Sequence, residues 1–209
     1  MVTERARYSF QRSDLVGGHA VLDLVNTVTG RDSRPTDWLE TCERLLEWAA
    51  LTDAFLPDDL RALERMRAGD AAAAARALAR LRAMREAVYQ VVIAAIRHDP
   101  VPEDAMGRLT RHWKSSVAAA QLTFSAGRAS LQFNIADSRL EYPRHVLAAS
   151  AFDLLQTLPL QRTRECADPR CTWIFIDHSR GGQRRWCNMA TCGNQAKSRR
   201  HHQRKRAAP

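Results

Sequence analysis

The 209-residue sequence has no long apolar run. No segment approaches the ~18 to 20 consecutive apolar residues that a membrane-spanning helix needs. The first ten residues, MVTERARYSF, also lack the apolar centre of a secretory signal peptide. These absences argue against an integral membrane protein and against a secreted one. We therefore expect a cytoplasmic protein with no membrane partner.

The motifs of the common enzyme classes are missing as well. The chain has no nucleophile elbow, no Walker-type phosphate loop, no glycine-rich dinucleotide turn and no His-Glu-x-x-His pair. Cys42 stands alone among Leu39, Leu45 and Leu46, a setting that favours a buried, unreactive thiol over a nucleophile. We therefore expect that the protein is not an enzyme.

Cysteine is scarce and unevenly placed. The chain has five cysteines, and all except Cys42 lie within residues 166–209. A reducing compartment disfavours a framework of disulfides, so this crowding favours metal ligation.

Charge is unevenly placed in the same way. Residues 1–161 hold 20 Lys and Arg against 20 Asp and Glu, whereas residues 162–209 hold 12 against 3. The net charge of +9 therefore lies entirely in the C-terminal quarter. Phosphate contacts come mainly from clustered Lys and Arg, so this distribution predicts a segment that binds a polyanion.

Apolar periodicity predicts helices near the N-terminus. Residues 19–28 follow a Gly17-Gly18 turn with apolar residues near helical spacing, which predicts a short buried helix, although the valines leave a strand open. Thr36 resembles the N-cap of an amphipathic helix that ends near residues 51–53.

The middle of the chain predicts further helices. Pro57 and the acidic residues after it open one helix, and Gly69-Asp70 interrupts it. Residues 71–96, rich in Ala, Arg and Leu, then form a long helix.

One hairpin and one more helix complete the predicted N-terminal domain. Residues 121–133 alternate apolar and polar side chains around a turn at residues 125–128, and a helix follows Pro143. The predicted fold is mainly α with a small β-hairpin (α+β). A helical domain over residues 1–160 precedes a small zinc-ribbon or treble-clef-like finger over residues 161–209.

The four C-terminal cysteines are arranged as two pairs. Cys166 and Cys171 form one C-x4-C unit, Cys187 and Cys192 form a second, and fifteen residues separate the units. Four thiolates complete a tetrahedral zinc shell and leave no open position for a catalytic water. The sequence therefore predicts one structural zinc ion per chain, with reduced structural cysteines or disulfides as the alternatives.

The segment between the two units predicts a small β-structure. Residues 173–176 are predicted as a strand, residues 179–182 as a turn and residues 184–186 as the return strand. The aromatic side chains of this segment are expected to form a miniature core: Trp173, Phe175 and Trp186.

After Cys192 the sequence is strongly basic and has no apolar face. As a helix it aligns cations at spacings of three and four residues, and the alternative is a solvated, frayed tail. The residues expected to contact phosphates are Arg184, Arg185, Lys197, Arg199, Arg200, Arg204, Lys205 and Arg206.

Three polar residues near the N-terminus offer a second candidate site. His19, Asp23 and Asn26 lie at spacings that one helical face allows, so they could line a pocket for a small-molecule effector. Helix capping and buried hydrogen bonds explain them better, because polar residues at a helix start ordinarily satisfy backbone donors.

The finger segment resembles the CGNR zinc-finger family. The matching positions include Cys166, Cys171, Trp173, Phe175, Asp177, Arg180, Arg184, Arg185, Trp186, Cys187, Cys192, Gly193, Asn194, Lys197, Arg199 and Arg200. Gln195 stands where the family name places an arginine. Upstream, the segment GGHAVLDLVNT over residues 17–27 resembles the start of the stress-induced transcription-regulator (ABATE-type) domain that usually precedes this finger. The resemblance implies a mostly helical N-terminal domain, a C-terminal finger and a role in transcription.

These observations favour a DNA-binding transcriptional regulator. In this hypothesis the zinc finger docks on duplex DNA, and side chains such as Gln195 or Arg199 recognise the bases. The N-terminal domain senses a ligand or mediates homodimerisation. One alternative is RNA binding, with Trp173 or Trp186 stacking on bases if exposed. Another is a zinc-stabilised module that binds an acidic protein.

Overall fold

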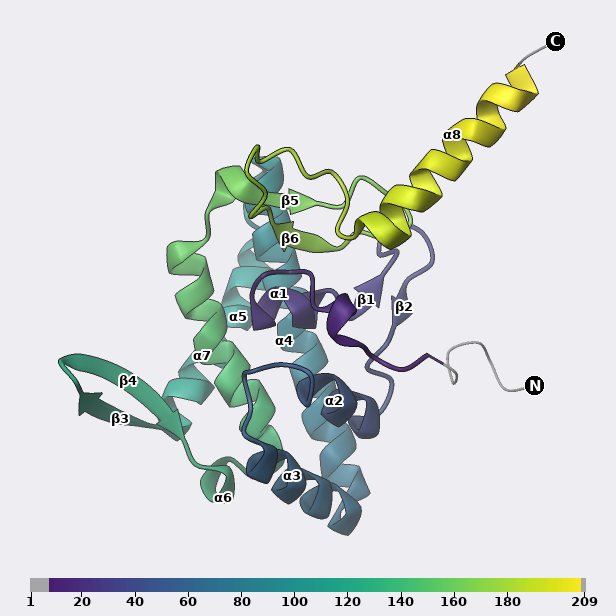
Figure 1. The fold of residues 1–209 in the computed structure, drawn as a ribbon. Helices are drawn as coiled ribbons and strands as arrows, with labels where there is room; N and C mark the ends of the chain where they lie inside the picture. The colour runs from purple at the N-terminus through teal and green to yellow at the C-terminus, as the bar shows by residue number, and fades with distance from the viewer. Residues whose placement is uncertain (1–7, 208–209) are drawn as a thin grey trace.

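A computed structural model describes residues 8–207 of the chain. A bundle of helices forms the body, a two-stranded hairpin extends from one side of it, and the last helix extends from the opposite end (Figure 1). The helices are α1 (Ala20–Val25), α2 (Cys42–Ala49), α3 (Pro57–Gly69), α4 (Ala71–Arg97), α5 (Glu103–Ala119), α6 (Ile135–Ser138), α7 (Tyr142–Thr157) and α8 (Asn194–Ala207). Short helical turns are η2 (Arg12–Asp14), η3 (Arg139–Glu141), η4 (Leu160–Arg162) and η5 (Met189–Gly193).

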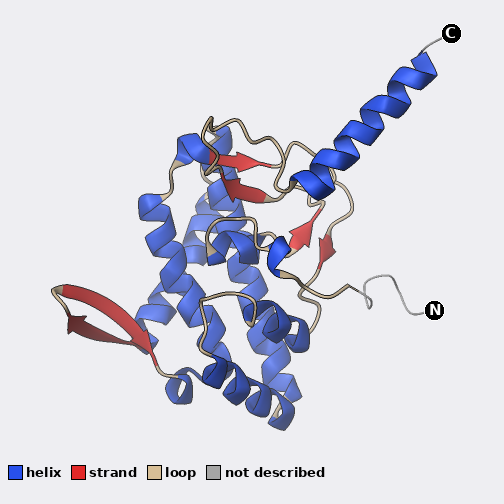
Figure 2. Cartoon of the chain, in the orientation of Figure 1, coloured by secondary structure: helices blue, strands red, loops and turns tan. Residues whose placement is uncertain are grey.

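The strands pair as three separate two-stranded antiparallel sheets (Figure 2). They are β1 (Val28–Thr29) with β2 (Thr36–Asp37), β3 (Ala120–Ser125) with β4 (Arg128–Phe133), and β5 (Thr163–Glu165) with β6 (Ile174–Ile176). The mainly α class with a small β-hairpin is therefore confirmed.

Helix α4 runs through the body and packs on both α5 and α7, which also pack on each other. It begins where the Asp70 carboxylate accepts the Ala73 N–H at 2.8 Å, and it ends at His98, which adopts a left-handed conformation (φ 57°). The predicted helix over residues 71–96 is confirmed. Helix α5 was not predicted, because only Ala105, Leu109 and Ser116 are buried along it and its apolar stripe is thin.

One predicted helix start is wrong. Thr36 belongs to β2 instead, and the N-cap of α2 is Thr41, whose hydroxyl accepts the Arg44 N–H. Asp37 explains the difference, because its carboxylate is bound by the buried Arg85 guanidinium through two hydrogen bonds of 2.8 Å. That ion pair holds residues 36–37 in an extended segment over α4.

The hydrophobic core of the body extends into the finger. Trp48, Leu22 and Met84 are among its fully buried members, and Ile174 and Ile176 of β6 join the same cluster. The finger is thus packed on α1 and α4 through its strands. No helix in the described part of the chain combines the length and apolar character that a bilayer crossing needs.

Candidate zinc centre and nucleic-acid interface

The four predicted ligands meet at one point. The Sγ atoms of Cys166, Cys171, Cys187 and Cys192 all lie within 4.8 Å of one another. The Sγ atom of Cys187 lies 3.6 Å from those of Cys171 and Cys192. A tetrahedral zinc ion with bonds of ~2.3 Å separates its sulfur ligands by about 3.8 Å, so this cluster fits the ion.

The first ligand pair is shaped by a tight turn at Asp168. The Cys171 N–H donates to the Asp168 carbonyl oxygen at 2.9 Å, and the Asp168 carboxylate accepts the Arg170 N–H at 3.1 Å. The Cys166 N–H donates to the Trp173 carbonyl oxygen at 2.8 Å. These bonds close the loop so that both thiols point toward the same centre.

The second ligand pair is shaped by one π-helical turn, η5. The Asn188 side chain caps it by accepting the Ala190 N–H at 2.8 Å. Gly193 is buried, and a Cβ atom there would lie 2.5 Å from the Met189 Sδ atom. A larger residue after Cys192 would therefore have to displace the Met189 side chain where this turn leads into α8.

The miniature core is present, but its strand pairing is not the predicted one. Phe175 is fully buried with three of the cysteines, and Trp173 and Trp186 pack against them. The predicted return strand over residues 184–186 is wrong, because β6 pairs with β5 instead.

Arg184 explains why its segment stays irregular. Its N–H donates to the Asp177 carboxylate at 2.8 Å, and its guanidinium donates to the Trp186 and Cys187 carbonyl oxygens. The same guanidinium lies 4.4 Å from the centroid of the Phe175 ring. Arg184, predicted to contact phosphate, is thus already engaged inside the finger.

Helix α8 carries the strongest charge in the chain. Residues 194–207 contain six Lys or Arg and no Asp or Glu. The helix extends away from the body toward the C-terminus (Figure 1). The predicted contact residues with exposed side chains are Arg185, Lys197, Arg200 and Lys205. Arg204 and Arg206 lie on the same helix, but their side chains are outside what the structure describes.

Two bonds join the base of α8 to the first zinc loop. The Arg199 Nη2 atom lies 3.0 Å from Oδ2 of the buried Asp168, and Arg170 Nη2 donates to Gln195 Oε1 at 2.7 Å. Burial disfavours ionisation of Asp168, but hydrogen bonds from the Arg170 N–H and the Arg199 guanidinium hold the pKa of its carboxyl below its ordinary value. Gln195 and Arg199, expected to reach bases, therefore have internal partners.

The finger is tied to the body by Asn26 and Gly30, which lie on either side of β1. The Asn26 side chain both donates to the Ile174 carbonyl oxygen and accepts the Ile174 N–H, each at 2.8 Å. The Gly30 N–H donates to the carbonyl oxygen of the ligand Cys171 at 2.9 Å. Residues 26–31 therefore connect the helical body directly to the zinc loop.

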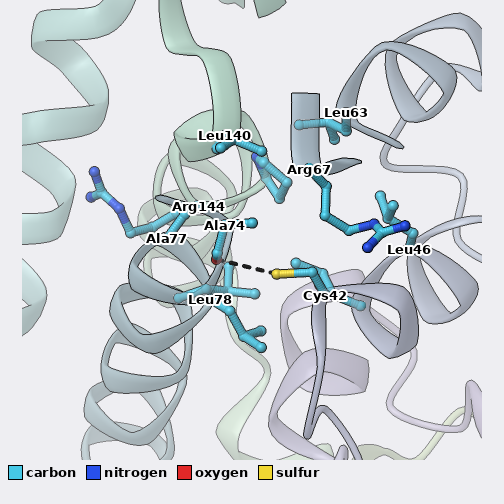
Figure 3. A pocket seen from close by; sticks show the side chains of 12 residues that line it. Cys42, Leu46, Leu63, Arg67, Ala74, Ala77, Leu78, Leu140 and Arg144 are labelled. Atoms are coloured by element: carbon cyan, nitrogen blue, oxygen red, sulfur yellow. Dashed lines mark hydrogen bonds between the residues drawn. The ribbon is translucent and has the colours of Figure 1, made fainter. Parts of the chain in front are cut away.

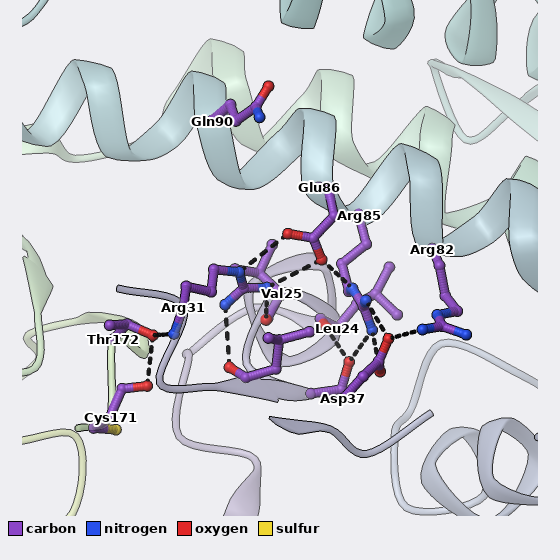
Figure 4. A network of polar contacts seen from close by, with 12 residues as sticks. Leu24, Val25, Arg31, Asp37, Arg82, Arg85, Glu86, Gln90, Cys171 and Thr172 are labelled. Carbon is purple, nitrogen blue, oxygen red and sulfur yellow. Dashed lines mark hydrogen bonds and ion pairs between the residues drawn. The ribbon is translucent and has the colours of Figure 1, made fainter. Parts of the chain in front are cut away.

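A partly buried charge network supports this connection (Figure 4). The Arg31 guanidinium pairs with Glu86 of α4 and lies 4.1 Å from the Tyr89 ring centroid, while its backbone N–H donates to Thr172 Oγ1 at 3.2 Å. Thr172 has φ +61°, which is strained for a β-branched residue, and its hydroxyl donates to the Cys171 carbonyl oxygen at 2.6 Å. The strained residue next to a zinc ligand is thus held by α4 through Arg31.

Each residue of the second candidate site has a structural partner. His19 caps α1 through Nδ1, Asp23 Oδ1 accepts the Gly17 N–H at 2.8 Å, and Asn26 binds Ile174. Burial raises the pKa of the Asp23 carboxyl to about 6 and lowers the pKa of His19. The void that Asp23 and Asn26 help to line is about 10 Å³, roughly the space of one water.

A much larger cleft lies between the body and the zinc cluster. Its volume is about 450 Å³, and Tyr8, Trp38 and Trp173 form its aromatic wall. Both indole N–H groups donate to Thr29 Oγ1, at 3.0 and 3.1 Å, and the Tyr8 and Trp38 ring centroids are 4.7 Å apart. Three of the cysteine ligands and Gln195 line the cleft too. Sequence reasoning missed Tyr8 and Trp38, since no spacing relates them to the distant cysteines.

Cys42 lies apart from these features, in a small apolar cavity between α2, α3 and α4 (Figure 3). The cavity has a volume of about 20 Å³, and the Cys42 thiol donates to the Ala74 carbonyl oxygen at 3.1 Å. Burial raises the pKa of this thiol. A protonated, hydrogen-bonded thiol in so small a space is a packing residue.

Comparison with known families accounts for most of the chain. Residues 18–158 match the ABATE family, described as "Putative stress-induced transcription regulator", and residues 162–205 match the CGNR zinc finger family. A search of curated proteins finds none that matches. The helical body corresponds to the first family, and the four-cysteine cluster with its basic helix corresponds to the second. The chain therefore belongs to the ABATE family and carries a C-terminal CGNR zinc finger.

Proposed function

We propose that this protein is a DNA-binding transcriptional regulator that contacts duplex DNA through α8. The observation that supports it most is the charge of this helix, which carries six cations and no acidic residue while it extends clear of the body. A helix with no apolar face gains nothing from packing on protein, whereas DNA phosphates neutralise its cations and release counterions.

The dimensions of α8 suit the major groove. An α-helix with its side chains is about 10–12 Å wide, which is close to the ~12 Å width of the groove. The 14 residues of α8 span about 21 Å at ~1.5 Å per residue. Lys197, Arg200 and Lys205 are exposed and are the phosphate contacts in this proposal, with Arg185 beside them on the finger.

Zinc orients the helix in this proposal. One zinc ion per chain holds the two ligand loops together, and the Asp168–Arg199 pair fixes the base of α8 to the first loop. The ion is structural in this proposal, since four thiolates fill its coordination shell and the proposed activity is not enzymatic. Metal analysis of the purified protein tests the stoichiometry: one zinc per chain is expected, and a folded finger with far less zinc would contradict it.

The N-terminal body supplies regulation in this proposal. It acts in the cytoplasm by sensing a small-molecule effector or by mediating self-association. The contacts of Asn26, Gly30 and Arg31 with the finger support this, because a change in the body is passed directly to the loop that carries Cys171.

Binding of duplex DNA across a salt series tests the proposal. The triple variant Lys197→Ala, Arg200→Ala, Lys205→Ala should flatten the slope of log K against log salt by about 0.9 per lost phosphate contact. The matched control is Arg65→Ala, Arg76→Ala, Arg111→Ala, which removes the same charge from exposed positions of the body. Equal slopes for the two variants would overturn the assignment to α8, and binding only to an acidic protein would favour the interaction-module alternative.

A second candidate, single-stranded nucleic acid such as RNA, is favoured by the aromatic cleft. Trp173 is only half-buried and lines this cleft beside Gln195 of α8. Unstacked bases bind aromatic side chains in this way, with about 1–3 kcal/mol per stacked base. Competition between duplex DNA and an RNA strand of equal length separates the candidates: stronger binding of RNA, together with quenching of tryptophan fluorescence, would favour the second.

A further inference from the structure

The β3–β4 hairpin extends from the helical body as an arm with an exposed apolar face (Figure 1). Leu122 is 75% exposed and Phe124 is 76% exposed, and both lie on β3. Leu131 pairs directly with Leu122 across the hairpin, and Phe133 pairs with Ala120. Residues directly opposite each other on antiparallel strands share a face, so these apolar side chains form one continuous surface.

The arm lacks the features that keep a lone hairpin soluble. Both of its outer edges are unpaired, since β3 and β4 bond only to each other within the described residues. Edge strands are usually protected by charged side chains, yet Arg128 is the only charged residue in residues 120–133. An isolated two-stranded hairpin is marginally stable in water, so a partner that covers its apolar face would stabilise it.

A hollow of about 490 Å³ lies between the arm and α7. Leu122, Leu131 and Phe133 line one side of it, and Val146, Ala149 and Asp153 of α7 are among the residues on the other side. The apolar face of the arm therefore faces a groove on its own chain, and the arm does not fill this groove.

We propose that the arm and this hollow form the interface of a homodimer, in which a second copy of the chain is the occupant. Each copy of the chain carries both an arm and a groove. A twofold axis therefore lets the two apolar faces pack on each other and lets each arm enter the partner's groove. Six residues per strand give each arm a length of about 20 Å, enough for the two arms to lie antiparallel.

The charges support this occupant. Arg128 lies at the tip of the arm, and Asp153 lies on the α7 side of the hollow. Within the part of the chain that the structure describes, neither side chain forms a salt bridge, and the charged group that Asp153 interacts with on its own chain is His19. An arm that enters the partner's hollow passes along α7 of the partner, so Arg128 of one copy approaches Asp153 of the second. The interface is separate from α8, so it stands whether or not the helix binds DNA.

Sedimentation velocity of the zinc-loaded full chain, measured without DNA over a concentration series, tests the proposal. A dimer is expected, and Leu122→Ser with Phe124→Ser should weaken self-association at least ~100-fold, since burying each large apolar side chain accounts for about tenfold or more. The matched control is Leu56→Ser, which removes a side chain that is 67% exposed on α3's N-cap. It should leave self-association unchanged.

A charge reversal in the hollow tests the other half of the interface. Asp153→Arg places a cation opposite Arg128 and should weaken self-association ~10-fold or more, whereas Asp99→Arg, at an exposed position after α4, should have no effect. All four variants change exposed side chains, and circular dichroism verifies that they fold. A monomer at every concentration, or a dimer that the arm and hollow variants leave intact, overturns the proposal.

Discussion

The side-chain amide of Asn26 replaces a strand partner for Ile174. It satisfies both the N–H and the carbonyl oxygen of that residue at 2.8 Å, and Asn26 is only 2% exposed. A residue at the end of α1 thus completes the hydrogen bonding of β6, 148 positions away. The helical body and the zinc finger are therefore joined by hydrogen bonds to the backbone of β6 as well as by apolar contacts.

The first prediction concerns this amide. Asn26→Ala leaves two buried backbone groups of Ile174 without partners and should lower the free energy of unfolding by about 2–5 kcal/mol. Asn134→Ala removes a single capping bond at an exposed helix start, so it should cost only about 0.5–2 kcal/mol. Urea denaturation of the two variants measures both values. Equal losses would mean that the Asn26 bonds add nothing beyond an ordinary cap.

Zinc removal is predicted to loosen the body as well as the finger. Chelation frees the ligand loops, and Ile174 and Ile176 then lose the support that holds them in the body core. Hydrogen exchange should accelerate in β6 and in α1, while α3, which packs on α2, α4, α6 and η3, keeps its protection. Unchanged exchange in α1 after complete zinc removal would show that the finger is an independent unit.

Acidification is predicted to destabilise the α5–α7 interface. Burial, and then the nearby Arg144 guanidinium, lower the pKa of His112 to about 4. The unfolded chain takes up this proton near pH 6.5, so the free energy of unfolding should fall as the pH drops from about 6.5 to 4. The pKa of the neighbouring His145 is lowered as well, by burial and by Arg144, and adds to the same trend.

The variant His112→Asn should flatten this pH dependence. The control His98→Asn changes an exposed residue whose left-handed conformation asparagine tolerates, and it should leave the dependence in place. Thermal unfolding at pH 4, 5, 6 and 7 measures the slopes. If His112→Asn and the parent chain lose stability in parallel, the lowered pKa of His112 is not the cause.

Asp23 is predicted to give the opposite pH dependence, because it lowers the free energy of unfolding as the pH rises. Its pKa is raised to about 6, so the carboxylate penalises the folded state increasingly as the pH rises from about 4 to 6. Asp23→Asn retains an oxygen to accept the Gly17 N–H and should stabilise the protein by about 1–3 kcal/mol at pH 7. At pH 4 the gain should vanish. Asp53→Asn, at an exposed position, is the control and should change little at either pH.

The sequence predicted most of the helices and turns whose ends are marked by nearby residues. Asp70 before an alanine-rich run marks the start of α4, and the Ala126-Gly127 turn, with φ of 50° and 76°, closes the predicted hairpin. The paired cysteine loops likewise predicted the sulfur cluster, because each loop closes within five residues.

Elements that depend on distant partners were not predictable in this way. Thr36 has the residue type of a cap, but the Asp37–Arg85 ion pair places it in a strand. The segment that contains Arg184 has a strand-like sequence, but its N–H group bonds to the Asp177 carboxylate instead. The aromatic cleft likewise joins Tyr8 and Trp38 to Trp173 across more than half of the chain. Sequence spacing carries no signal for such contacts.

Selection of genomic DNA fragments by the zinc-loaded protein shows whether α8 makes this protein a DNA-binding regulator. The full chain should enrich particular fragments at physiological salt, and the variant Lys197→Ala, Arg200→Ala, Lys205→Ala should lose them. The control variant with three arginines replaced on the body should enrich the same fragments as the full chain. Failure of the full chain to enrich any fragment, or equal enrichment by the α8 variant, would show that α8 is not a DNA-binding helix.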